Sequence, residues 1–175
     1  MVYEQKIVIP EEVKVELQDG GNIEVSKEGA SVSRIFVHPH VTCNISDSTI
    51  VISTESKRNQ DRAVVGTWTS HINNLIKGVT SGFTYSLKIV YTHFPMNVSV
   101  NGDVVDIKNF LGAKGILKAN ILGETKVVVK KEDVIVSGTN REDVGQTAAN
   151  IEKACKVKGK DRRVFQDGVY LVTKE

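Results

Sequence analysis

The sequence predicts an α+β protein made of two tandem copies of one small domain, each an antiparallel sheet packed against one helix. Two observations indicate this class. Runs of alternating apolar and polar residues precede one long stretch in which apolar residues recur every three or four positions. The same order then occurs a second time within 175 residues, which are enough for two small cores. We therefore expect domains at 1–82 and 83–175.

The first copy opens with a hairpin. Apolar residues alternate at 13–17 and 23–25 on either side of Gly20 and Gly21, and such a glycine pair is typical of a tight turn. Further strands are expected in three later runs, at 31–37, 42–45 and 49–53. The last of these is the most apolar and should be the most buried.

The pattern then changes to that of a helix. From 60 to 79 the apolar positions recur at three- and four-residue intervals, so one face of a long helix is apolar. The residues of this face are Val64, Val65, Trp68, Ile72, Leu75, Ile76 and Val79. Ser81 and Gly82 follow, and this pair favours termination of the helix.

The second copy begins with another hairpin, at 96–100 and 104–107 around the turn residues Asn101 and Gly102. Three more strands are expected, at 118–122, 125–129 and 134–137. Between the two copies, the run 83–94 also alternates. We expect it to be a long strand shared by both domains, which would make their connection rigid.

A second helix follows, and either Thr139 or Asn140 can cap it. Its apolar face consists of Val144, Ala148, Ile151, Ala154 and Cys155. The two helices align at a shift of 79 residues, with Val65 over Val144, while the hairpins align at 82 or 83. A longer loop before the first helix absorbs the difference, so we interpret the pattern as an internal duplication.

Composition is that of a soluble globular protein, with 40% apolar and 25% charged residues. The first residues lack a leader pattern, and no apolar run approaches the roughly 18 residues of a membrane span. These features favour a cytoplasmic protein without a membrane partner. Cys43 and Cys155 lie far apart without metal-ligand spacing, so we expect free, mostly buried thiols.

Charge is divided unevenly between the two halves. Residues 1–82 hold 8 Lys/Arg against 10 Asp/Glu, a net charge of −2, whereas 83–175 hold 15 against 11, a net charge of +4. The positive field therefore belongs to the second half, and any polyanionic partner should bind there.

The most informative segment places six basic residues within eleven positions, together with one acidic residue. The six are Lys153, Lys156, Lys158, Lys160, Arg162 and Arg163. Lys153 and Lys156 fall where a helix C-terminus favours cations in any case. The others surround Gly159, which permits close approach, and they resemble a phosphate-binding loop. The alternative is a charged edge that is merely solvated.

A second basic set lies between two strands of the same domain. It consists of Lys108, Lys114 and Lys118, around Gly112 and Gly115. We expect it to bind phosphate as well if the fold brings it near the first set.

Two aromatic residues accompany the main basic segment. Phe165 and Tyr170 can stack on bases. Around Asp167 and Gly168, however, a strand-turn-strand arrangement is expected, and there such rings more often belong to the core.

Patterns typical of enzymes are weak. His38, His40 and Cys43 offer three metal-ligand types without a fourth, and no phosphate loop or nucleophile elbow is present. His71 and His93 are single histidines with no nearby carboxylate in the sequence. We therefore expect no catalysis, no metal and no cofactor, and a hydrolase in an unrecognised fold is the least favoured alternative.

The C-terminal residues resemble the closing signature of the large-subunit ribosomal protein six family, in its archaeal and eukaryotic branch. The matching residues are Lys160, Arg163, Phe165, Asp167, Gly168, Val169, Tyr170, Leu171 and Lys174. The signature usually opens with glutamine, and this chain departs from it with Lys153 at that position. The helix at 66–83 also resembles the family's first-domain helix, and the duplicated α+β layout extends the resemblance over nearly the whole chain.

The resemblance implies a structural constituent of the cytoplasmic ribosome. The second domain would bind large-subunit ribosomal RNA near the sarcin-ricin loop, through both basic sets and Lys174. The first domain would face neighbouring ribosomal proteins at the base of the factor-recruiting stalk. Neither a membrane nor a small-molecule substrate is implied. The alternative is a non-ribosomal, protein-binding adaptor built of the same repeated unit.

Overall fold

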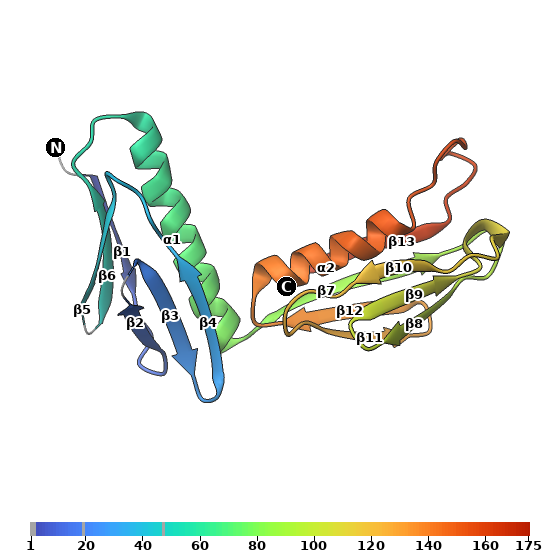
Figure 1. Cartoon of the computed structure of the whole chain (residues 1–175), viewed down its shortest axis with the longest axis horizontal. Coiled ribbons are helices and arrows are strands. Elements are labelled where there is room, and N and C mark those ends of the chain that lie inside the picture. The colour runs from blue at the N-terminus through green and yellow to red at the C-terminus, as the bar shows by residue number, and fades with distance from the viewer. Residues whose placement is uncertain (1–2, 19, 47) are drawn as a thin grey trace. The chain divides into compact units, whose positions relative to one another are not determined.

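The computed structural model describes residues 3–18, 20–46 and 48–175. The chain divides into two compact units, with the division between Ser81 and Gly82. Each unit consists of antiparallel strands and one α-helix (Figure 1), so the predicted fold class is confirmed. The strands of each unit form two separate sheets, where the sequence led us to expect one.

In the first unit, two three-stranded sheets lie against one long helix, α1 (Asn59–Thr80). The strands are β1 (Tyr3–Val8), β2 (Lys14–Gln18), β3 (Asn22–Lys27), β4 (Ala30–Ile35), β5 (Thr42–Ser46) and β6 (Thr49–Thr54). The sheets have the orders β1-β6-β5 and β2-β3-β4. Because α1 contacts strands of both, it closes the core between them.

The apolar face predicted for α1 is the face that it buries. Val65 and Ile72 are fully buried and share a core with Ile23 and Ile50 from the two sheets. Of the predicted face, only Val64 remains partly exposed. The helix ends at Thr80 and the chain turns at Gly82, whose φ of +72° favours glycine.

The second unit has seven strands and the helix α2 (Arg141–Ala154). The strands are β7 (Phe83–Val90), β8 (Asn97–Asn101), β9 (Val104–Lys108), β10 (Leu117–Asn120), β11 (Lys126–Lys130), β12 (Asp133–Gly138) and β13 (Gly168–Lys174). A short 3₁₀ turn, Phe110–Gly112, joins β9 to β10. The sheets have the orders β10-β9-β8 and β11-β12-β7-β13.

Both units share one topology, which supports the interpretation as a duplication. The sheet β1-β6-β5 corresponds to β7-β12-β11, and β2-β3-β4 corresponds to β8-β9-β10. In each unit the helix follows the last strand of this common set. The second unit adds β13 to the remaining edge of β7. The basic segment lies in the connection that leads from α2 to this additional strand.

The prediction that 83–94 forms a strand shared by the two domains is wrong. β7 pairs with β12 on one edge and with β13 on the other, and both belong to the second unit. The first unit has its own equivalent strand, β1, which pairs with β6. The sequence did not reveal β1 because Ile7 is its one buried side chain, so no alternating apolar run marks it.

The helix α2 begins and ends as expected. The Asn140 side chain caps it by accepting a hydrogen bond from the Glu142 N–H at 3.0 Å. Thr147 is fully buried, and its hydroxyl accepts a hydrogen bond from the Leu122 N–H at 3.0 Å, which ties the helix to the chain after β10. The C-terminal cap is Cys155, so the basic segment starts in the last turn of the helix, at Lys153.

Both cysteines are free thiols, as the sequence predicts. Burial raises the pKa of Cys155 to about 12 and that of the half-buried Cys43 to about 11. Neither thiol is therefore activated as a nucleophile.

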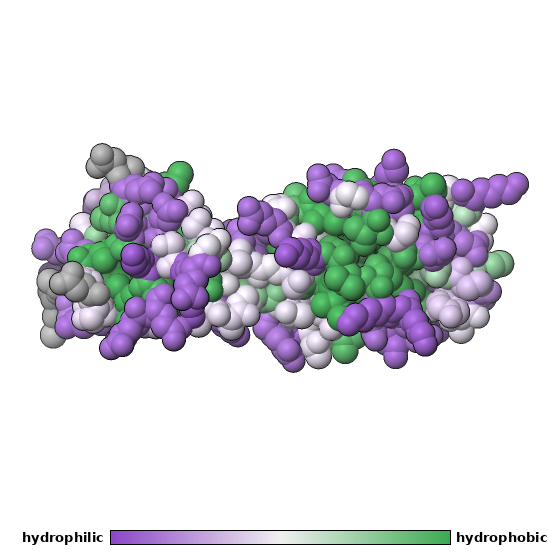
Figure 2. Space-filling model, turned by 90° about the horizontal axis from the view of Figure 1, so that it is seen from below, coloured by the Kyte–Doolittle hydropathy of each residue, from purple (hydrophilic) through white to green (hydrophobic). Residues whose placement is uncertain are grey.

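Several apolar side chains reach the surface, and Figure 2 shows hydrophobic areas between hydrophilic ones on each unit. The most exposed are Val8, Val37 and Ile35, at 74%, 73% and 70%, all in the first unit. Within the described ranges, no helix is long and apolar enough to cross a membrane. In the same ranges, no three His, Cys, Asp or Glu side chains gather where a metal ion could be held.

Candidate nucleic-acid interface

The main basic set lies on an exposed loop that runs from the end of α2 to β13 (Figure 1). Every candidate side chain of this set is exposed, namely Lys156, Lys158, Lys160, Arg162 and Arg163. Gly159 has a φ of +67° and open space around it, so it lets the loop turn between two lysines. The loop therefore presents five cations to solvent.

The single acidic residue of the loop organises its turn. The Asp161 carboxylate accepts a hydrogen bond from the Arg163 N–H at 2.9 Å. The Asp161 carbonyl accepts another from the Phe165 N–H, also at 2.9 Å. These bonds fold 161–165 into a compact turn, so Arg162 and Arg163 are held on a defined backbone.

A buried carboxylate fastens the far end of the loop. Asp167 is fully buried, and its Oδ1 accepts hydrogen bonds from the N–H groups of Thr92 and His93 at 2.9 and 3.2 Å. Its Oδ2 lies 2.9 Å from His93 Nδ1. Burial alone would raise the pKa of Asp167, but these hydrogen bonds outweigh it and lower the pKa to about 2. His93, which has no carboxylate near it in the sequence, is thus paired with a carboxylate 74 positions away.

Phe165 packs between two charged or polar side chains of the loop region. Its ring stacks on His93, with centroids 4.6 Å apart and an interplanar angle of 20°. Lys160 Nζ lies 4.6 Å from the centroid of the same ring, in cation–π contact. Residues before Asp167 form this turn rather than the expected strand, so Phe165 is half-buried under the loop instead of lying in the core.

The second basic set reaches the same end of the second unit. Lys108, Lys114 and Lys118 are all exposed. The loop that carries Lys114 is fastened to the segment after β7, because the Asn109 side chain donates a hydrogen bond to the Pro95 carbonyl at 2.9 Å.

A close contact at Gly112 also holds this loop against the segment after β7. A Cβ at Gly112 would lie 3.2 Å from the Phe94 ring, so the two are in close contact. The segment 92–95 thus contacts both basic loops, which lie at one end of the second unit (Figure 1).

Lys174 does not lie at the end of the second unit that carries the two basic loops. It pairs with Tyr85 on β7, whereas Gly168 pairs with Val90, five positions further along that strand. At about 3.4 Å per residue, the two ends of β13 are roughly 17 Å apart. Lys174 Nζ instead lies 6.0 Å from the Tyr85 ring centroid.

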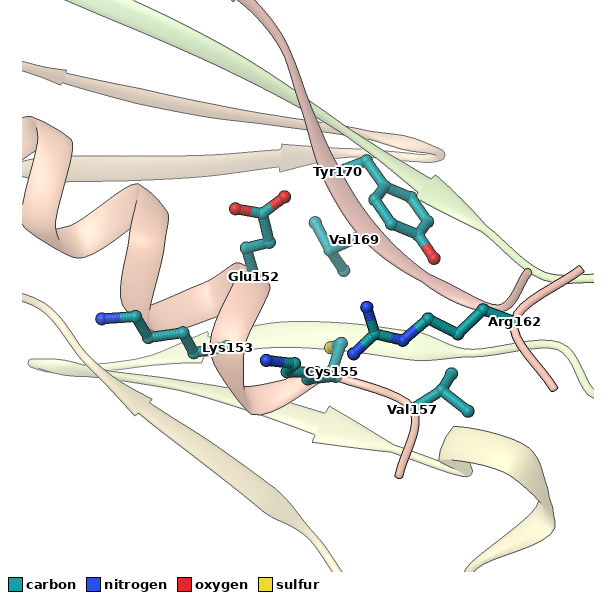
Figure 3. A pocket seen from close by; sticks show the side chains of 8 residues that line it. Glu152, Lys153, Cys155, Val157, Arg162, Val169 and Tyr170 are labelled. Carbon is teal, nitrogen blue, oxygen red and sulfur yellow. The ribbon is translucent and has the colours of Figure 1, made fainter. Parts of the chain in front are cut away.

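A pocket of about 250 Å³ opens beside the loop, at the C-terminal end of α2 (Figure 3). It is lined by Glu152, Lys153, Cys155, Lys156, Val157, Arg162, Val169 and Tyr170. Sequence reasoning attributed Lys153 to the helix terminus and Tyr170 to the core, yet Tyr170 is 42% exposed. The exposure of Tyr170 could have been inferred from the alternation along β13. Successive side chains of a strand point to opposite faces, so Tyr170 lies on the face opposite the buried Val169.

Comparison with known proteins agrees with these features. A family model described as "Ribosomal protein L6" matches residues 9–82 and 94–168. The chain is 47% identical to the large ribosomal subunit protein uL6 of Methanobrevibacter smithii over 171 residues, covering 98% of this chain and 96% of that protein. It is 48% identical to the uL6 proteins of Methanosphaera stadtmanae and Methanosarcina mazei, covering 96% of this chain and 91% and 95% of theirs. The resemblance seen in the sequence is confirmed: the chain belongs to the ribosomal protein L6 family.

Proposed function

We propose that this protein is a structural constituent of the large ribosomal subunit whose second unit clamps ribosomal RNA. The observation that carries the proposal is the exposed basic loop, which presents five cations and is fastened at its end by the buried Asp167. Lysine and arginine side chains neutralise phosphates and release counterions, and backbone contacts of this kind hold an RNA fold in place. A fastened loop loses less conformational entropy on binding than a free one.

The predicted RNA contacts are the exposed cations at this end of the second unit. They are Lys156, Lys158, Lys160, Arg162, Arg163, Lys108, Lys114 and Lys118, with Gly159 allowing close approach. We place Lys174 outside the main contact, because it lies at the other end of β13. The resemblance to the family points to RNA near the sarcin-ricin loop.

We assign the first unit to neighbouring ribosomal proteins near the stalk base. Its half of the chain has a net charge of −2, which disfavours contact with phosphates. It also exposes apolar side chains beside a groove of about 340 Å³, which Leu17, Phe36 and Val37 help to line. Exposed apolar patches of this kind are typical of protein interfaces.

Competition binding tests the location of the RNA site. The full-length protein is bound to labelled large-subunit ribosomal RNA, and two unlabelled competitors are compared: a fragment carrying the sarcin-ricin region and an unrelated RNA of the same length. We expect the fragment to displace the protein at concentrations well below those of the unrelated RNA. Equal competition by both would contradict the location, and association that is insensitive to salt would favour the protein-binding adaptor.

A further inference from the structure

The pocket at the end of α2 has the size of a small aromatic group. A cavity of about 150 Å³ holds a benzene ring, whereas drug-sized ligands occupy roughly 300–1,000 Å³. The volume of about 250 Å³ lies between these and suits one nucleobase. Cys155, Val157 and Val169, all buried, contribute an apolar floor.

An aromatic ring forms one wall of this pocket, and its position is set by a neighbouring glycine. A Cβ at Gly168 would lie 3.1 Å from two atoms of the Tyr170 side chain, so the ring lies directly over Gly168. Gly168 has no unusual φ, and the close approach of Tyr170 is therefore what excludes a side chain there. A ring held in this way loses little freedom when a base stacks on it.

Cations surround the same opening. Arg162 extends its guanidinium group into the pocket from the loop, whereas the ammonium group of Lys153 points away from Arg162 and Tyr170 (Figure 3). Lys156 also lines the pocket, from the end of α2. In the part of the chain that the structure describes, no hydrogen bond or ion pair engages the Arg162 guanidinium. An apolar floor, an aromatic wall and two cations, Arg162 and Lys156, match the parts of a nucleotide, which are an aromatic base and a phosphate.

We propose that this pocket binds one unstacked nucleotide of the ribosomal RNA, with its base against Tyr170 and its phosphate held by Arg162 and Lys156. The inference rests on the proposed function and names the ligand of part of that interface. The Glu152 carboxylate also lines the pocket. The same carboxylate can accept a hydrogen bond from the exocyclic amino group of a base.

Salt dependence separates stacking from phosphate contact. For the full-length protein and large-subunit ribosomal RNA, we expect Tyr170→Ala to weaken binding about tenfold to a hundredfold without changing the slope of log affinity against log salt. Tyr170→Phe keeps the ring and should bind within about threefold of the wild type. Lys156→Gln, which removes one phosphate contact, should reduce the slope by about one. Tyr3→Ala, which removes an exposed tyrosine of the first unit, is the matched control and should bind as wild type.

A fluorescence measurement tests the contact without removing the ring. Trp68 is the one natural tryptophan and lies in the core of the first unit. In Tyr170→Trp, the added indole should be quenched by the stacked base when large-subunit ribosomal RNA is added, whereas the wild-type emission from Trp68 should stay constant. Binding without additional quenching would overturn the inference.

The two proposals fail in different ways. If the wild-type protein does not bind this RNA in a salt-dependent manner, the proposed function itself is wrong. If the wild type binds but Tyr170→Ala binds equally well, the RNA interface stands and the nucleotide pocket does not exist.

Discussion

At the scale of single residues, Asp167 has the largest structural role in the RNA-facing loop. It connects the start of β13 to the segment after β7 through three hydrogen bonds, although the two segments are about 75 positions apart in the chain. Its pKa is about 2, below the ordinary 3.8, mainly because the hydrogen bonds from His93 and Thr92 outweigh the effect of burial. The Asp167 carboxylate therefore stabilises the folded state in addition to holding the two segments together.

The lowered pKa of Asp167 predicts how stability depends on pH. A carboxyl whose folded pKa lies below its unfolded value stabilises the fold fully above about pH 4 and loses this contribution as the pH falls toward 2. The shift corresponds to about 2 kcal/mol. Asp167→Asn should thus destabilise the second unit at neutral pH and make it less sensitive to acid between pH 4 and 2.

Thermal melting of the full-length Asp167→Asn protein checks this expectation. Circular dichroism follows both units, and the emission of Trp68 follows the first unit alone because that side chain packs in its core. Only the transition of the second unit should move to lower temperature. An equal shift in the Trp68 transition would show that the effect of Asp167 is not local.

Residue-level features differ in how far the sequence can predict them. That Lys158, Lys160 and Arg162 are exposed could be predicted, since a dense run of cations cannot be buried. The partnership of His93 with Asp167 could not, because nothing local to either residue indicates a contact between distant segments. The same limit explains why the pocket around Tyr170 was not predicted.

At the scale of elements, the helices were the most predictable. Both have apolar residues at helical spacing on one face, and that face is buried in each. Strands with clear alternation were found as well. β1 was not, because its other side chains are exposed or half-buried, and its pairing with β6 depends on tertiary structure. Because β1 was not predicted, the strand at 83–94 was assigned to both domains.

The position of β13 predicts a difference between two lysines that the family signature alone does not distinguish. Lys158 lies on the basic loop, and Lys174 lies about 17 Å from it along β13. We expect Lys158→Glu to weaken RNA binding about tenfold and Lys174→Glu to change it less than threefold. Equilibrium binding of both single variants at one salt concentration measures this. Equal losses would mean that the RNA extends along the whole strand.

At the scale of the whole molecule, the duplicated fold carries two different surfaces. The half with net charge −2 carries the three most exposed apolar side chains, Val8, Val37 and Ile35, and the half with net charge +4 exposes a fastened basic loop. The sequence predicted this division of charge and the two repeated domains. It did not predict the pocket and the groove, because each is formed by side chains from several elements.

A substitution in the first unit should separate the two surfaces. Val37 is 73% exposed and lines the apolar groove, so Val37→Asp places a charge there with little effect on the core. We expect this variant to bind ribosomal RNA with the wild-type affinity and salt slope, but to enter large subunits less efficiently during reconstitution. Normal incorporation would contradict the assignment of this groove to a protein neighbour.

The central claim is that the basic loop clamps RNA through its phosphates, and the salt dependence of binding tests it most directly. The five loop cations alone should contribute about −4 to the slope of log affinity against log salt. The double variant Lys160→Glu with Arg162→Glu should fold normally, since both side chains are exposed, and should lose most of the binding and about two units of slope. Lys57→Glu with Arg58→Glu, an equal charge change in the first unit, is the control and should bind as the wild type. A shallow wild-type slope, or equal losses in both double variants, would contradict the claim.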